Sequence, residues 1–142
     1  MLCEGPSEER FVKDILAPYL SEYQVYLIPI ILGGVSRYAG IRKELKRIGK
    51  DSSSYLTTML DYYGLPQDVL GVIQSNDKEI TLITEIIEDA IKKDLCNELQ
   101  CKGFFPNIIM HEYEALLFSD VNAFHVCEGM AGKVISQLKK ET

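Results

Sequence analysis

The stretch Met1–Phe11, MLCEGPSEERF, decides the fold that the sequence predicts. Its first three residues are apolar and are typical of the end of a strand, and Gly5 lets the backbone turn sharply. Pro6 suits the first position of a helix, where Ser7 is expected to cap the free amide groups. Glu4 then lies at the carboxyl end of a buried strand, where open α/β sheets place their ligands.

The same alternation of strand and helix continues along the chain. Apolar, β-branched segments predict strands, and apolar residues at helical spacing predict helices. The expected strands cover residues 25–32, 55–60 and 104–110, and the expected helices cover residues 11–20, 36–49, 78–100, a short stretch after Ser119, and 129–140. This order predicts a compact three-layer α/β domain with a mostly parallel sheet of about four strands joined by right-handed crossovers.

Three chain breakers refine these boundaries. Pro18 should end or kink the first helix, because its ring clashes with the preceding turn. Pro29 cannot donate a ladder hydrogen bond, which places its strand at a sheet edge or places Pro29 at a strand end. Residues 102–103, Lys-Gly, are expected to close the longest helix.

The composition fits one soluble domain over residues 1–142. The formal net charge is −6, which argues against a broad basic surface for nucleic acid. No apolar run approaches the length of a membrane span, and the first residues lack the apolar region of a signal peptide, so we expect a cytoplasmic protein. Few residues precede Glu4 in the first strand, which suggests a domain shortened at this end.

Carboxylates follow three of the expected strands: Glu4, Asp61, and the pair Glu112 and Glu114. Because parallel strands end at one sheet edge, these groups can converge there. Clustered carboxylates repel one another unless a proton or a cation neutralises them, and hard oxygen ligands suit Mg²⁺ or Mn²⁺. Taken singly, each acid also fits an ordinary role as a cap charge, a turn residue or a solvated strand edge.

The helix expected over residues 36–49 and the residue that follows it carry the one concentrated basic surface of the sequence. Its basic residues are Arg37, Arg42, Lys43, Lys46, Arg47 and Lys50. They are interpreted either as a solvated helix face or as a contact for phosphate or an acidic partner. Arg37 and Tyr38 can bind phosphate beside the Gly33–Gly34 turn, or pack locally. His111 is a metal ligand or proton shuttle in one interpretation, and a structural residue in the other.

Four motifs in order resemble a known family. CEGPSEERFV at 3–12 is similar to the Glu-Gly-x-Ser/Thr-Glu signature of Toprim catalytic domains, particularly those related to the overcoming-lysogenization-defect nucleases. GGVSRY at 33–38, TTMLDYYGLP at 57–66 and HEYEALLFSD at 111–120 extend the match to the bacterial Toprim-like family catalogued as domain of unknown function 4276. That family includes the Toprim effector of the PARIS anti-phage defence system, which works with an ATPase partner.

The resemblance implies a Toprim, Rossmann-like fold and a role for each matching acid. Glu4 matches the glutamate of metal-dependent acid/base chemistry, Glu8 the second acid of that motif, and Asp61 the acid after the third strand. The family's Asp-x-Asp pattern is absent here, because Tyr63 stands at the second position. Glu112 or Glu114 is expected to substitute for it. The family also continues beyond Thr142, so the chain is expected to be either a fragment or a naturally short member.

We therefore expect a metal-dependent nuclease that hydrolyses phosphodiester bonds in RNA or DNA. The resemblance adds tRNA as a possible target, anti-phage defence as the setting, and control by an AAA/ABC-type ATPase. The alternative is a non-catalytic Toprim-fold module that docks on the ATPase through its basic helix. Small-molecule phosphoryl chemistry is a third hypothesis. The oligomeric state is not fixed by the sequence, and a homodimer stays open.

Overall fold

A parallel β-sheet organises residues 1–71 and 80–110, which are the residues that this computed structural model describes. The elements are β1 (Leu2–Cys3), α1 (Pro6–Phe11), the π-helical turn η1 (Val12–Leu16), α2 (Ala17–Ser21), β2 (Ile30–Ile31), α3 (Tyr38–Ile48), β3 (Tyr55–Asp61), α5 (Ile80–Leu95), β4 (Gly103–Phe105) and β5 (Ile108–Ile109).

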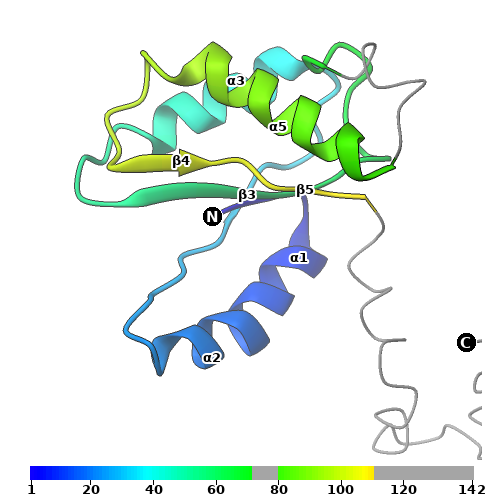
Figure 1. The fold of residues 1–142 in the computed structure, drawn as a ribbon. Helices are drawn as coiled ribbons and strands as arrows, with labels where there is room; N and C mark the ends of the chain where they lie inside the picture. Colours follow the sequence, from blue (N-terminus) through cyan, green and yellow to red (C-terminus); the bar gives the residue numbers. More distant parts are fainter. Residues whose placement is uncertain (72–79, 111–142) are drawn as a thin grey trace, which may run out of the picture. The chain divides into compact units, whose positions relative to one another are not determined.

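The strand order is β2–β1–β3–β4, with β5 also paired to β3, and all of these pairs are parallel. Figure 1 shows α3 and α5 on one face of the sheet, with α1 and α2 on the other. The predicted three-layer α/β architecture with a parallel sheet is confirmed. Since the helices that follow β1 and β3 lie on opposite faces, the carboxyl ends of these two neighbouring strands form the switch point at which such sheets bind ligands.

The main core lies between the sheet and the helices α3 and α5. Leu56 and Leu60 project from β3 towards it, and Ile41, Leu45 and Ile91 are among the helical side chains that cover them. All five are at most 1% exposed. The alternation along β3 puts Thr57 and Met59 on the other face, so one strand separates two packing layers.

The strand expected over residues 25–32 is much shorter, because only Ile30 and Ile31 form β2. Pro29 immediately precedes it, as its missing donor predicts, and β2 lies at the edge of the described sheet. This short strand pairs with β1 and the residue before it: Ile30 donates its amide to the carbonyl of Met1, and Leu32 donates its amide to that of Cys3.

The strand expected over residues 104–110 is interrupted, so that β4 and β5 pair with β3 in a single register around a gap at Pro106 and Asn107. Proline has no amide hydrogen for the ladder. The buried hydroxyl of Thr58 replaces the missing pairing: it donates to the Asn107 carbonyl at 2.8 Å and accepts from the Asn107 amide at 2.7 Å.

The helix boundaries differ from those expected from the sequence at three further points. Pro18 does not end its helix: the preceding turn widens into η1, and the helix continues as α2. Ser7 is not the cap of α1, since that position belongs to Gly5. The longest helix ends at Leu95, before residue 100, and Gly103 begins β4. The helices expected after residue 119 lie outside the described residues.

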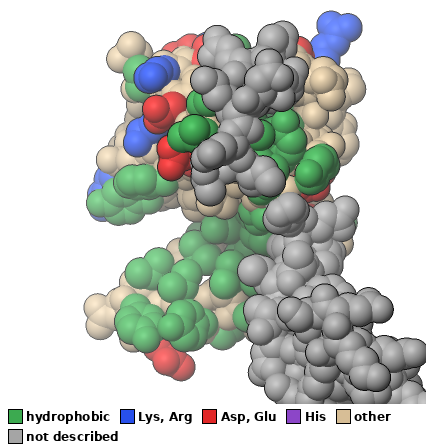
Figure 2. Space-filling view, turned by 45° about the vertical axis from the view of Figure 1, so that its right-hand side comes forward, with side chains coloured by type: hydrophobic (Ala, Val, Ile, Leu, Met, Phe, Trp, Pro, Cys, Tyr) green, Lys and Arg blue, Asp and Glu red, His purple; other side chains and the backbone are tan. Residues whose placement is uncertain are grey.

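Large apolar side chains are exposed on α2, on the segment that follows it and at the end of β4. They include Tyr19, Tyr23, Tyr26, Ile28 and Phe105. Figure 2 shows hydrophobic side chains gathered over the lower part of the molecule, where α1, η1 and α2 lie. An exposed apolar patch of this kind is typical of a surface that contacts another molecule or segment. In the described part of the chain, no helix is long and apolar enough to cross a membrane.

Candidate functional site

Glu4 lies immediately after β1 and is held against the end of β3. Its amide donates to the carbonyl of Met59 at 3.2 Å, which continues the pairing of β1 with β3 by one residue. Its carboxylate oxygen Oε2 accepts a hydrogen bond from the amide of Asp61 at 2.9 Å. Local backbone pairing and a side-chain contact therefore place Glu4 at the switch point of the sheet.

Gly64 fixes the space that the Glu4 carboxylate occupies. A Cβ atom at this position would lie 2.9 Å from the carboxylate carbon and oxygen Oε2 of Glu4, and closer still to Oε1. A side chain at residue 64 would therefore displace the carboxylate. The turn that follows β3 approaches Glu4 this closely because residue 64 is glycine.

Asp61 ends β3 beside Glu4, so the structure brings together two of the predicted acids. The Asp61 carboxylate accepts from the amide of Tyr63 at 3.3 Å, which is a typical Asx-turn contact. Both carboxylate residues are half-buried. Two adjacent acids at the end of parallel strands fit Mg²⁺, which is often bound through one or two carboxylates together with water and substrate phosphates.

Glu8 has a local structural contact. Its Oε2 accepts a hydrogen bond from the amide of Gly5 at 2.8 Å, reaching back from the first turn of α1. This is the arrangement in which a glutamate at the third helical position stabilises a helix start. The contact explains Glu8 without a metal ion, and its role as a metal ligand stays a prediction.

His111, Glu112 and Glu114 lie outside the described residues, so their predicted roles are untested. Among the described residues, no group of three or more Asp, Glu, His and Cys side chains is arranged to hold a metal ion. The described site thus offers two carboxylates. Cys3 precedes them but is fully buried, and burial raises the pKa of its thiol, so its side chain is suited to packing and not to nucleophilic attack.

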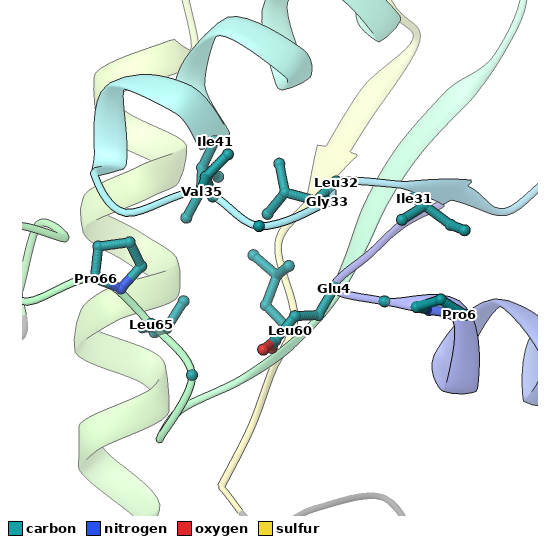
Figure 3. Close-up of a pocket in the computed structure, with 13 residues that line it drawn as sticks. Glu4, Pro6, Ile31, Leu32, Gly33, Val35, Ile41, Leu60, Leu65 and Pro66 are labelled. Atoms are coloured by element: carbon teal, nitrogen blue, oxygen red, sulfur yellow. The ribbon is translucent and has the colours of Figure 1, made fainter.

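A cavity of about 520 Å³ opens beside Glu4. Figure 3 shows Gly33 and Val35, from the loop after β2, on one side of it, and Glu4, Leu65 and Pro66 on the other. Apart from Glu4, the described side chains that line it are apolar. The candidate site therefore combines an acidic edge with an apolar pocket large enough for a small organic group.

Most of the basic side chains within α3 form ion pairs with acidic residues. Arg42 pairs with Asp94 at 2.8 Å and with Glu98, and Lys46 also pairs with Glu98. Arg47 pairs with Glu44. The contacts with Asp94 and Glu98 join α3 to α5 and to the residues just after it. All of these pairs neutralise cations that were candidates for phosphate binding, and the predicted role of these cations remains untested.

Tyr38 and Arg37 differ although they are neighbours. Tyr38 is buried, its hydroxyl donates to Asp94 at 3.0 Å, and its amide donates to Asp68 at 2.8 Å. Burial, followed by the hydrogen bond to Asp94, raises the pKa of the Tyr38 hydroxyl. Arg37 is exposed at the start of α3, beyond the Gly33–Gly34 loop. Of the two, Arg37 is the one whose side chain is available to a phosphate.

One family model matches residues 3–142, and its description is domain of unknown function (DUF4276). The chain belongs to this family. No curated protein and no solved structure matches it. The DUF4276 assignment agrees with the family suggested by the four motifs, and it carries no activity of its own.

For this DUF4276 member, sequence reasoning placed Glu4 and Asp61 at the correct edge of the sheet but missed the glycines around them. Gly64 limits the position of the Glu4 carboxylate, and Gly34 lines the cavity. Both lie within motifs used for the family resemblance, GGVSRY and TTMLDYYGLP. A signal was therefore present, but the contact between residues 4 and 64 depends on the fold.

Proposed function

We propose that this chain is a metal-dependent nuclease domain that hydrolyses phosphodiester bonds in nucleic acid. One observation carries the proposal: Glu4 and Asp61 meet at the ends of β1 and β3, with the Asp61 amide bonded to the Glu4 carboxylate. This is the switch point of a parallel sheet, and a cavity opens beside it. Two carboxylates at this position attract a divalent cation, whereas they would repel an anionic substrate that arrives without one.

The chain's own groups have separate tasks in this proposal. Glu4 and Asp61 supply carboxylate oxygens to Mg²⁺ or Mn²⁺, and the Asp61 amide orients the Glu4 carboxylate. When bound, such an ion lowers the pKa of a water molecule and offsets the charge of the phosphate. Gly64 leaves the Glu4 carboxylate the space that it needs.

The finer parts of the proposal rest on the motif resemblance. They are the Toprim relation, a cytoplasmic role in anti-phage defence, an ATPase partner that controls activity, and tRNA as one substrate to test. Glu112 or Glu114 would add a further oxygen ligand, and His111 would bind the metal or move a proton.

A Mn²⁺ titration by calorimetry tests the site. Wild type is compared with Glu4→Gln, which retains an oxygen acceptor for the Asp61 amide while removing the charge, and with Asp61→Asn. Each variant should weaken binding by at least about tenfold, because losing an indirect partner of a metal already costs that much. The rates at which the variants hydrolyse tRNA and plasmid DNA should fall together with their Mn²⁺ affinity.

Glu9→Gln is the matched control, because it removes the same charge from a neighbouring acid whose partner is Lys13. It should leave Mn²⁺ binding and hydrolysis unchanged. Equal Mn²⁺ affinity in wild type and Glu4→Gln, with both proteins folded by circular dichroism, would exclude Glu4 as a ligand and end this proposal.

The exposed apolar residues favour a second candidate function, that of a non-catalytic interaction module. Tyr23, Tyr26 and Ile28 are each more than 60% exposed. The α3 cations expected to dock on a partner are largely paired with acids, so this apolar surface is the better docking candidate among the described residues. Binding to the ATPase that survives Glu4→Gln, without any metal-dependent hydrolysis by wild type, would favour the module.

A further inference from the structure

The cavity beside Glu4 contains more than a metal ligand. Its walls include Ile31, Leu32, Val35, Leu60, Leu65 and Pro66, which come from the ends of β2 and β3 and the loops that follow them. Among the described residues that line it, Glu4 is the one with an ionisable side chain. We infer that this cavity receives one unpaired nucleobase of a single-stranded nucleic acid, next to the phosphate that a metal ion bound by Glu4 and Asp61 would hold.

The lining chemistry selects the base and not the phosphate as the occupant. A phosphate inside the cavity would lose its water to apolar walls and would face the carboxylate of Glu4, and both effects are unfavourable. A nucleobase is uncharged and has apolar faces that can pack against Leu32 and Leu65. The cavity volume, about 520 Å³, lies within the range of small-ligand pockets.

The Gly33–Gly34 loop supplies the polar contacts that a base edge needs. Both glycines line the cavity, and their peptide groups have no hydrogen bond to another described residue. A Cβ atom at either position would meet no atom within 4 Å, so side chains do not screen this backbone. Recognition of base edges and faces in this way is typical of proteins that bind unpaired nucleotides.

A paired base cannot reach this cavity without leaving its stack, and that costs a few kcal/mol. The protein also lacks compensating charge. Its net charge is −6, and the α3 cations Arg42 and Lys46 are already paired with acidic residues of and just beyond α5. Affinity for a duplex would have to come from phosphate contacts, so the structure favours a single strand.

This inference rests on the proposed nuclease function for its substrate, and Gly34→Leu tests it. The φ angle of Gly34 is not in the left-handed region, and its surroundings are open, so a side chain is compatible with the fold. Leucine there should narrow the cavity and weaken binding of a single-stranded 12-nucleotide DNA about tenfold, the lower part of the range for losing one base contact. Wild type should bind this strand more tightly than the same sequence as a duplex.

Ser36→Leu is the matched control, since Ser36 is exposed in the same loop and is not a lining residue of the cavity. It should bind the DNA like wild type. Ile31→Trp is a second cavity variant, because Ile31 lines the cavity at the end of β2 and is 37% exposed. Wild-type affinity in both folded cavity variants, or equal affinity for single strand and duplex, would overturn the inference.

A titration with the four free nucleosides, in the absence of metal and monitored by NMR, separates this inference from the proposed function. Nucleosides carry no phosphate, so shifts of the Gly33 and Gly34 amides that are lost in Ile31→Trp support the base pocket even if Mn²⁺ does not bind. Mn²⁺-dependent hydrolysis that is unaffected by Gly34→Leu and Ile31→Trp would leave the nuclease proposal standing and overturn the base pocket.

Discussion

At the scale of single residues, Gly64 controls the most important carboxylate of the candidate site. We predict that Gly64→Ala moves the Glu4 side chain, because the new Cβ would lie 2.9 Å from its carboxylate carbon. The contact is with the flexible end of a side chain, so the free energy of unfolding should change little. Mn²⁺ affinity should fall by about 10- to 100-fold, as for loss of a group that orients a ligand.

Gly34→Ala is the control for this prediction, because a Cβ atom at residue 34 meets nothing within 4 Å. It should retain wild-type Mn²⁺ affinity in the same calorimetric titration. Thermal unfolding of both variants separates an effect on the site from an effect on folding. A Gly64→Ala protein with unchanged Mn²⁺ affinity would show that the position of Glu4 is not what limits metal binding.

The residue scale also shows what the sequence can and cannot predict about the site. Glu4 and Asp61 were predictable, because a carboxylate directly after a buried apolar segment falls at a strand end whatever the rest of the fold does. The contact of Gly64 with Glu4 was not predictable, since it joins residues 60 positions apart. Tyr38 was expected either to bind phosphate or to pack locally. Its hydroxyl bonds to Asp94 of α5, and only the packing of the two helices reveals this contact.

At the scale of secondary-structure elements, Tyr38 and Asp94 join α3 to α5. Tyr38→Phe removes one hydrogen bond while Arg42 still pairs with Asp94, so we expect a loss of about 1 kcal/mol in the free energy of unfolding at pH 7. The raised pKa of Tyr38 gives this loss a pH dependence. Folded wild type holds the phenol proton more tightly than the unfolded chain does, so the stability is present below about pH 10 and is lost as pH rises above it.

Urea unfolding at pH 7 and at pH 10.5 tests this linkage. The difference in unfolding free energy between wild type and Tyr38→Phe should shrink or reverse at the higher pH. Tyr55→Phe is the control, because the Tyr55 ring is 66% exposed and its hydroxyl makes no hydrogen bond to a described residue. A Tyr38→Phe difference that stays constant between the two pH values would contradict the linkage.

The elements also differ in how well the sequence predicts them. The helix α3 and the strand β3 were predictable, since each carries its own period of apolar residues over at least seven positions. The short β2 and the break between β4 and β5 were not, because both depend on partners. β2 can pair only along β1, and the break at Pro106 is tolerated because Thr58, far away in the sequence, bonds to Asn107.

At the scale of the whole molecule, charge decides how nucleic acid can be held. The chain has 15 Lys and Arg residues against 21 Asp and Glu residues, and ion pairs between α3 and the region that ends α5 occupy Arg42 and Lys46. A broad electrostatic surface is therefore missing from the described residues. In the proposed function, binding of nucleic acid would therefore depend on metal-bridged phosphate, on base contacts, and on a few exposed cations such as Arg37.

This charge distribution predicts a weak salt dependence for single-stranded DNA binding at a fixed Mg²⁺ concentration. Because few phosphates would be neutralised by Lys or Arg, raising NaCl from 50 to 200 mM should weaken binding by less than about tenfold. Arg37→Gln should flatten the dependence further, since Arg37 is exposed near the cavity loop, whereas Lys50→Gln, at the far end of α3, should not. Fluorescence anisotropy across the salt series measures both slopes. A loss of affinity of about a thousandfold or more would instead mean that six or more phosphates contact Lys or Arg side chains. Binding would then be mainly electrostatic and would not depend mainly on base and metal contacts.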